Sequence, residues 1–148
     1  NCMVMDDLDL VPQIEALSLK LDGLRIVIDH CLMLNSTRKT ESTIDCMKKL
    51  SRLPNLYAKL TSGTHGSARV YPHEDMHGLL KQVIDAFTPD RCVWGSNFPN
   101  ALWSKGTSYA QNLSLFTDEL GLSQTDKTAI LGKTAQILWF GEHIPARS

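Results

Sequence analysis

The sequence predicts an α/β fold built from four strand–helix units. Three short apolar runs have the character of buried parallel strands, and segments of helical periodicity separate them. The runs begin at positions 24, 55 and 90, which are 31 and 35 residues apart. Such an interval is long enough for a βα unit with its crossover helix, so consecutive runs are expected to be neighbouring parallel strands.

The predicted strands are short and end in small or polar residues. They are Leu24–Cys31 (LRIVIDHC), Asn55–Gly63 (NLYAKLTSG) and Asp90–Pro99 (DRCVWGSNFP), with a weaker fourth candidate at Cys2–Met5 (CMVM). Near-continuous apolar runs fit parallel strands, because helices cover such strands on both faces.

Helical periodicity fills the intervals between the predicted strands. Apolar residues three or four positions apart form four stripes: Ile14, Leu17 and Leu21; Ile44, Met47 and Leu50; Leu79, Leu80, Val83, Ile84 and Phe87; and Leu113, Phe116 and Leu120. A last helix is expected after Ser123, a suitable N-cap with Asp126 three residues later.

Four such units with right-handed crossovers form either a small doubly wound sheet or half of a (β/α)8 barrel. A doubly wound nucleotide-binding fold places a glycine-rich phosphate loop directly after a strand. The sequence has neither G-x-G-x-x-G nor G-x-x-x-x-G-K-[ST], and SGTHGS at 62–67 has the wrong spacing. In a barrel, the polar ends of the strands would lie at the C-terminal rim, where catalytic groups are mounted.

Composition and charge exclude several kinds of partner. The 148 residues include 15 basic and 16 acidic ones, for a formal net charge of −1, which argues against nucleic-acid and polybasic membrane-surface binding. No apolar run approaches the roughly 18–20 residues that span a bilayer. The four cysteines are widely spaced and lack a C-x-x-C pair, which predicts reduced thiols and a cytoplasmic location.

The stretch YPHEDMHGLL, residues 71–80, contains HEDMH at 73–77, a literal H-E-x-x-H. A zinc-peptidase helix needs both histidines on one helical face, apolar flanks and a third ligand downstream. Here Pro72 precedes His73, Gly78 ends the motif, and no downstream His or Glu stands at a recognisable ligand spacing. The pattern instead predicts a helix start, with proline in the first turn and acidic residues at the positive end of the helix dipole.

His30 is the strongest candidate for chemistry by its position. The pair Asp29–His30 ends an apolar strand, which places an imidazole at the active face of a barrel. There it could ligate a metal, hold a substrate oxygen or transfer protons. The alternative is a core histidine satisfied by a neighbouring carbonyl group. Cys31 follows directly, and on a regular strand its side chain points to the opposite face, which argues against a Cys–His nucleophile.

A second candidate site lies in WGSNFP, residues 94–99. Gly95 permits a close backbone approach, and Asn97 presents an amide that can donate and accept hydrogen bonds but cannot act as a carboxylate base. The alternative for Asn97 is an ordinary turn asparagine. Lys59, Ser62 and Arg69 could bind an anionic substrate at the rim, and the alternative for each is a solvated position on the surface.

Five stretches occur in an order that resembles a known family: RIVIDHC, LPNLYAKLTSG, YPHED, FTPDRCVWGSNFP and ILGKTAQILWF. Together they resemble the C-terminal half of the amidohydrolase-related (amidohydrolase 2) family, which includes sugar-lactone and pyrone-dicarboxylate lactonases and decarboxylases of the aminocarboxymuconate-semialdehyde type. The resemblance covers almost the whole chain. It implies a distorted (β/α)8 barrel, of which residues 1–148 are a partial domain with the last four βα units, the N-terminal half being absent.

The resemblance also implies roles for two residues. In the family, the histidine of the strand ending in Asp-His binds metal or polarises the substrate carbonyl, and His30 matches it. The last strand of the family ends in an aspartate that binds metal and takes a proton from the attacking water, but Asn97 stands there. The family's H-x-H of the first strand has no counterpart. The stretch NFPNALW, residues 97–103, is similar to a recognised variant of the family.

We therefore expect a hydrolase that acts on a small lactone or a carboxylate-bearing cyclic ester. His30 would polarise the substrate or ligate a divalent metal, with zinc as the expected ion. Asn97 would orient water or substrate, and Lys59 or Arg69 would hold the anionic group. The alternatives are a metal-dependent decarboxylase of the same family and a non-catalytic barrel that binds a ligand, because Asn97 replaces the usual aspartate.

Half a barrel leaves two open sheet edges and an exposed inner face. We therefore expect the chain, which begins with Asn1, to be part of a longer protein. Without its N-terminal half we expect it to be inactive and not stably monomeric, or else to pair with a second copy. The other expected partner is a small-molecule substrate, with neither nucleic acid nor membrane.

Overall fold

The computed structural model describes residues 1–4, 7–99 and 106–141. Its centre is a sheet of three parallel strands in the order β1 (Ile26–Ile28), β2 (Leu56–Leu60) and β3 (Cys92–Trp94). The weak fourth strand is present only as an isolated parallel bridge between Cys2 and Ile28. The sheet therefore has the strand order of successive βα units, as predicted.

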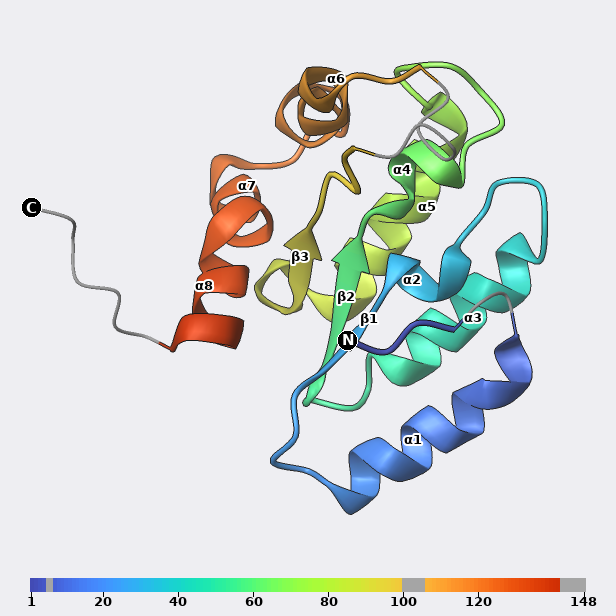
Figure 1. The fold of residues 1–148 in the computed structure, drawn as a ribbon, viewed down its shortest axis with the longest axis vertical. Helices are drawn as coiled ribbons and strands as arrows, with labels where there is room; N and C mark the ends of the chain where they lie inside the picture. The colour runs from blue at the N-terminus through green and yellow to red at the C-terminus, as the bar shows by residue number, and fades with distance from the viewer. Residues whose placement is uncertain (5–6, 100–105, 142–148) are drawn as a thin grey trace, which may run out of the picture.

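Helices connect these strands and continue beyond the last one. In chain order they are η1 (Leu8–Leu10), α1 (Val11–Lys20), α2 (His30–Met33), α3 (Thr40–Leu50), α4 (Ser62–His65), α5 (Glu74–Phe87), η2 (Pro89–Arg91), α6 (Tyr109–Ser114), η3 (Leu115–Glu119), α7 (Gln124–Thr128), η4 (Ala129–Lys133) and α8 (Thr134–Phe140). Helix α3 lies between β1 and β2 in the chain, and α5 lies between β2 and β3. The predicted alternation of strands and helices is confirmed (Figure 1).

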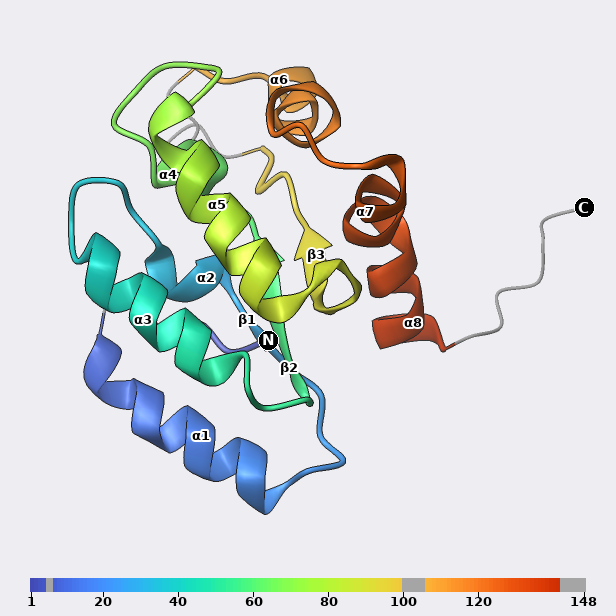
Figure 2. The same ribbon diagram turned by 180° about the vertical axis from the view of Figure 1, so that it is seen from behind.

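Alternate residues of each strand face opposite sides of the sheet. On one side, strand residues such as Ile28, Leu56 and Leu60 join Met47 of α3 and Phe87 of α5 in the main hydrophobic core. Figure 2 shows α3 and α5 lying over this side of the sheet. We call the other side the inner face. It carries the strand residues of the opposite parity, namely Val27, Tyr57, Lys59 and Val93, and Asp29, Thr61 and Gly95 follow directly after the three strands.

The predicted apolar stripes are confirmed for the helices that cover the sheet but only at Ile14 for α1. The stripe residues of α3 (Ile44, Met47, Leu50) are buried, as are Leu80, Val83, Ile84 and Phe87 of α5. In α1, Leu17 and Leu21 are each 44% exposed. The helix buries Ile14 as predicted, together with Val11 and Ser18, and the Ser18 hydroxyl donates to Asn55 Oδ1 over 2.6 Å. A polar anchor therefore fixes the face that α1 turns inward.

Helix α8 covers part of the inner face. Val27 and Val93 are 3% and 0% exposed, and they form a small cluster with Leu138 and Ala135 of α8. Arg25, just before β1, donates from Nη1 to the Ile137 carbonyl over 3.1 Å. The expectation of an exposed inner face is therefore wrong near Val27 and Val93, because the helix α8 packs there.

Two predicted features involve residues that the structure does not describe. The Leu-Trp pair of NFPNALW falls within residues 100–105, and Met5 of the weak strand falls within residues 5–6; neither range is described. Within the described ranges, no helix combines the length and the apolar character that crossing a bilayer requires.

Candidate active site

A left-handed turn follows the end of β1. His30, Cys31, Leu32 and Met33 have φ angles of 51°, 48°, 58° and 58°. Each such residue costs about 1–2 kcal/mol relative to the right-handed conformation, so the surrounding packing has to hold the turn. Cys31 and Leu32 are fully buried, and the Cys31 thiol donates to the Lys59 carbonyl over 3.3 Å. The prediction that Cys31 continues a regular strand is therefore wrong.

Asp29 lies at the centre of the polar group on the inner face. Its Oδ1 accepts from the His30 amide over 3.0 Å and lies 3.0 Å from Nζ of Lys59. The same oxygen is 3.6 Å from Nε2 of His30. Since Asp29 is only 5% exposed, the lysine on the neighbouring strand balances a carboxylate that has little contact with water.

The imidazole of His30 is held from two sides. Its Nδ1 lies 2.6 Å from the Thr61 hydroxyl, and the ring of His65 meets it edge-on with centroids 4.9 Å apart. Burial lowers the pKa of His30, the Asp29 carboxylate opposes this, and the Lys59 ammonium adds to the lowering. The ring is therefore biased toward the neutral form, in which one nitrogen donates and the other accepts a hydrogen bond.

His65, in α4, is a site residue that sequence reasoning missed. Burial, followed by the effect of His30, lowers its pKa to about 4, although a hydrogen bond with the Thr61 backbone opposes the shift. The available signal was a histidine four residues beyond Thr61, just after a strand with polar residues at its end. Because α4 turns away from the direction of the strand, side-chain alternation along the chain could not place the ring beside His30.

Gly95 leaves room for the polar group. A Cβ atom at this position would lie 2.8 Å from Cγ2 of Thr61 and 3.4 Å from Cε of Lys59. The predicted close approach at Gly95 is thus confirmed, and the groups that approach are the two side chains of the neighbouring strand.

The structure brings together some of the predicted site residues and separates others. His30 and Lys59 share Asp29 as a partner. Asn97 follows β3 with a left-handed φ of 53°, a conformation that asparagine tolerates better than most residues. No hydrogen bond or ion pair between described residues joins Asn97 or Arg69 to the Asp29–Lys59 pair. Ser62 begins α4, and its side chain lies outside the description.

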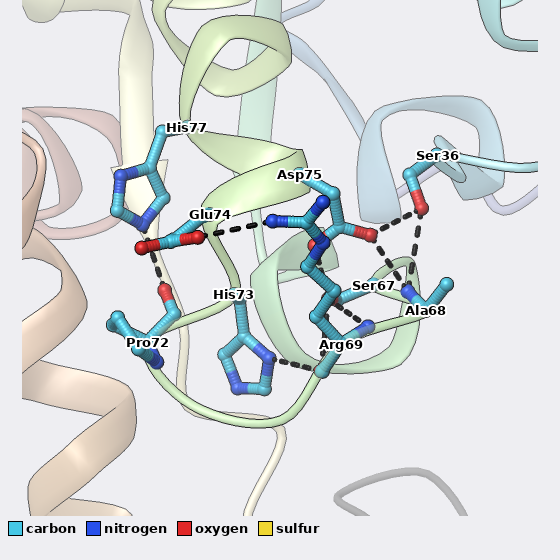
Figure 3. Close-up of polar contacts among 9 residues, drawn as sticks. All are labelled: Ser36, Ser67, Ala68, Arg69, Pro72, His73, Glu74, Asp75 and His77. Carbon is cyan, nitrogen blue, oxygen red and sulfur yellow. Dashed lines mark hydrogen bonds and ion pairs between the residues drawn. The ribbon is translucent and has the colours of Figure 1, made fainter.

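Arg69 belongs to a separate polar cluster at the start of α5 (Figure 3). Its guanidinium donates to Glu74 over 3.0 Å, and both side chains are more than 60% exposed. The backbone carbonyl of Arg69 also lies 2.9 Å from Nδ1 of His73. The ion pair with Glu74 therefore leaves the Arg69 guanidinium exposed to solvent and does not bring it to His30.

The H-E-x-x-H segment is a helix start, as predicted, because α5 begins at Glu74 with His73 as its N-cap. Pro72 lies before the cap and not in the first turn. His77 bonds through Nε2 to the Pro72 carbonyl over 2.7 Å, whereas His73 contacts the Arg69 carbonyl and the Thr107 hydroxyl. Figure 3 shows the two rings engaged by different parts of the loop, so they do not share a ligand site.

Asp75 in the same segment joins two loops that follow different strands. Its carboxylate accepts from the Ser36 hydroxyl (2.6 Å), the Ser67 hydroxyl (2.5 Å) and the Ala68 amide (2.8 Å) (Figure 3). Burial opposes ionisation of Asp75, but the hydrogen bonds from Ser36, Ser67 and Ala68 outweigh it and lower the pKa of the carboxyl. This network fixes the loops after β1 and β2 relative to α5.

The described residues of this chain do not by themselves form a metal site. Protein zinc sites use at least three ligands, and no group of three His, Cys, Asp or Glu side chains in the described ranges could hold an ion. Nδ1 of His30 is engaged by Thr61, and Asp29 Oδ1 is engaged by Lys59. His30 as a ligand therefore stays a prediction that depends on donors from elsewhere.

Residues 7–141 match the family model for amidohydrolases. The chain belongs to the amidohydrolase family. Among curated relatives, it is 29% identical over 91 residues to a 4-sulfomuconolactone hydrolase of Hydrogenophaga intermedia, covering 60% of this chain and 30% of that protein.

Solved structures of this family share the fold. A zinc-bound amidohydrolase from Burkholderia multivorans gives a TM-score of 0.75 at 24% identity, covering 91% of this chain and 50% of that one. A candidate 2-pyrone-4,6-dicarboxylic acid hydrolase from Pseudomonas putida gives 0.71 at 24% identity, with 90% and 50% covered. These neighbours are amidohydrolase barrels, of which this chain spans about half. The predicted partial (β/α)8 barrel is thus confirmed.

Proposed function

We propose that this amidohydrolase chain forms half of an active site that hydrolyses a small lactone or a carboxylate-bearing cyclic ester. The observation that carries the proposal is the group of Asp29, His30, Lys59 and Thr61 at the C-terminal ends of adjacent parallel strands, where barrels mount catalytic groups. The sulfomuconolactone hydrolase among the relatives supports a lactone as the substrate.

The reaction adds water across the lactone carbonyl. The water oxygen bonds to the carbonyl carbon, the ring C–O bond breaks, and one water proton passes to the departing alkoxide to give a hydroxy acid. Neutral His30 would donate a hydrogen bond from one ring nitrogen to the carbonyl oxygen, while Thr61 bonds to the other nitrogen. Asn97 would orient water or substrate, and Lys59 would hold an anionic oxygen.

We further propose that the other half of a barrel completes this site. The chain spans 50% of its structural neighbours, and the described group of residues contains the Asp29 carboxylate but holds it in an ion pair. An unpaired general base would then come from the completing half, supplied either by the same protein or by a second polypeptide. Arg69 and Ser62 remain candidates for contacts with the substrate at the rim.

The test is a lactone-hydrolysis assay by pH-stat. It would compare five- and six-membered lactones with and without a carboxylate, using the chain with any in-frame sequence that precedes it. Replacing His30 with Asn is expected to lower kcat/KM by about 100-fold or more, since the shorter amide has no atom at the position of Nε2, the ring nitrogen that would donate to the carbonyl oxygen. The matched control is His77→Asn, which changes a histidine that bonds the Pro72 carbonyl before α5.

A second candidate function is a ligand-binding barrel without catalysis, and the amide at Asn97 favours it. The variant Asn97→Asp separates the two. Hydrolysis that appears only in Asn97→Asp indicates a former enzyme that still binds its substrate. Hydrolysis by wild type that is lost in Asn97→Asp indicates a mechanism that requires the amide. Absence of hydrolysis in both proteins would overturn the enzyme proposal.

A further inference from the structure

The inner face of the sheet holds a partly buried ion pair between Lys59 of β2 and Asp29, which follows β1. Lys59 Nζ lies 3.0 Å from Asp29 Oδ1, and the two side chains are 24% and 7% exposed. Ile28 and Ala58 are partners in the register of β1 and β2. Asp29 and Lys59 each follow one position later. The parallel register therefore places the ammonium and the carboxylate side by side.

This pair occupies Oδ1 of the carboxylate that a metal would otherwise use. Asp29 Oδ1 already accepts from the His30 amide over 3.0 Å and from Lys59 over 3.0 Å. An ammonium group has no lone pair with which to ligate a metal, and its positive charge repels a divalent cation at such distances. His30 directs Nε2 toward the same oxygen, 3.6 Å away, so an ion bound there would lie beside the lysine.

The third strand is adapted to the lysine as well. Gly95 follows β3, and a Cβ atom there would lie 3.4 Å from Cε of Lys59. The lysine side chain thus runs past a position with no side chain of its own. The ends of three adjacent strands thus contribute the Asp29 carboxylate, the Lys59 ammonium and, at Gly95, the space that the lysine side chain occupies.

We propose that the Lys59 ammonium is the resident cation of this half-site and supplies the positive charge that a divalent metal would supply. Asp29 orients the ammonium, and the remaining N–H groups of Lys59 bind an anionic oxygen of the ligand. This assignment disagrees with the expectation of zinc at His30. It rests on the proposed function only for the contact with substrate, because the argument against a metal depends on the positions and charges of Asp29, His30 and Lys59.

The test is calorimetric titration of Zn²⁺ into the purified full chain near neutral pH. Wild type is expected to bind Zn²⁺ weakly, and Lys59→Met is expected to bind it about tenfold more tightly or better, because the repelling charge is gone and Asp29 is released. Lys59→Arg keeps the charge and should behave as wild type. The matched control is Lys49→Met, which removes an exposed lysine paired with Glu15 over 2.6 Å and should leave Zn²⁺ affinity unchanged.

A second titration with isophthalate, a planar dicarboxylate, tests the anion contact. Lys59→Met should weaken its binding, and Lys49→Met should not. Stoichiometric zinc in the purified wild type, or submicromolar Zn²⁺ affinity, overturns the assignment without any variant, so a variant that fails to fold does not leave the question open. Equal Zn²⁺ affinity in folded Lys59→Met and Lys49→Met also overturns it. A chain that opens no lactone yet shows the expected Zn²⁺ pattern would contradict the proposed function alone.

Discussion

The Thr61 hydroxyl lies 2.6 Å from Nδ1 of His30 and joins the end of β2 to the left-handed turn after β1. This bond leaves Nε2 of the ring as the nitrogen that faces Asp29, 3.6 Å away. A short link between two strands thus determines which side of His30 is available for chemistry.

Replacing Thr61 with Val tests the energetic weight of this link. Valine keeps the methyl group near Gly95 but leaves the buried ring nitrogen without its partner, so we expect the free energy of unfolding to fall by about 1–2 kcal/mol. Urea denaturation measures the change. The control is Thr128→Val, whose hydroxyl bonds the Gln124 carbonyl on the exposed side of α7 and should change stability by less than about 0.5 kcal/mol. Equal effects in the two variants would mean that the His30 bond does not stabilise the fold.

Replacing Gly95 with Ala tests the space around the polar group. The added methyl would lie 2.8 Å from Cγ2 of Thr61 and 3.4 Å from Cε of Lys59, so we expect a loss of about 1–3 kcal/mol in the free energy of unfolding. Gly78→Ala is the control, because a methyl there meets nothing within 4 Å and helix α5 should gain about 0.5–1 kcal/mol. A stable Gly95→Ala protein would show that Lys59 and Thr61 can move aside.

The buried imidazole of His65 predicts a loss of stability in mild acid. Its folded pKa is about 4, below the ordinary value of 6.5, so the unfolded chain binds the proton more readily. The stabilisation is complete above about pH 6.5 and is lost as the pH falls toward 4, by about 2–3 kcal/mol. Unfolding free energies measured across this range should fall with decreasing pH in wild type and fall less steeply in His65→Gln. Parallel pH profiles in the two proteins would contradict the assignment to His65.

The three hydrogen bonds to Asp75 predict a second acid-sensitive contact. Replacing Asp75 with Asn removes a charged acceptor shared by Ser36, Ser67 and Ala68, and we expect a loss of about 2–3 kcal/mol in thermal or urea unfolding. Because the folded pKa lies below the ordinary 3.8, the stabilisation is present above the unfolded pKa and disappears as the pH falls through the folded pKa.

The control for this prediction is Asp85→Asn, which changes an exposed carboxylate on the same helix and should leave stability within about 0.5 kcal/mol of wild type. If Asp75→Asn behaved like Asp85→Asn, the cluster in Figure 3 would be a surface contact without weight in folding.

Local periodicity was sufficient to predict the repeat of strands and helices. The stripes of α3 and α5 lie against the sheet because apolar spacing determines which face a helix buries. The same rule was only partly right for α1, which buries Ile14 but exposes Leu17 and turns Ser18 inward to bond Asn55. That bond joins residues 37 positions apart, so no local pattern contains it.

In the site, too, local sequence patterns predicted some features and not others. Asp29, His30 and Lys59 could be placed at one edge because parallel strands end on the same side of a sheet. The left-handed turn at His30–Met33 could not, since its φ angles are unfavourable for the residues concerned and only the packing of the whole domain maintains them. His65 was missed for a related reason, because the turn into α4 redirects the chain after β2.

The position of α8 has a consequence for how a ligand reaches Lys59. Ala135 and Leu138 pack with Val27 and Val93, and Arg25 ties α8 to the start of β1, so α8 covers the inner face at Val27, two residues before Asp29. In a completed barrel we therefore expect a ligand to reach the ammonium from the carboxyl ends of the strands and to depart by the same route. Substrate would then enter and product would leave through the same opening, so a bound product would delay the arrival of the next substrate.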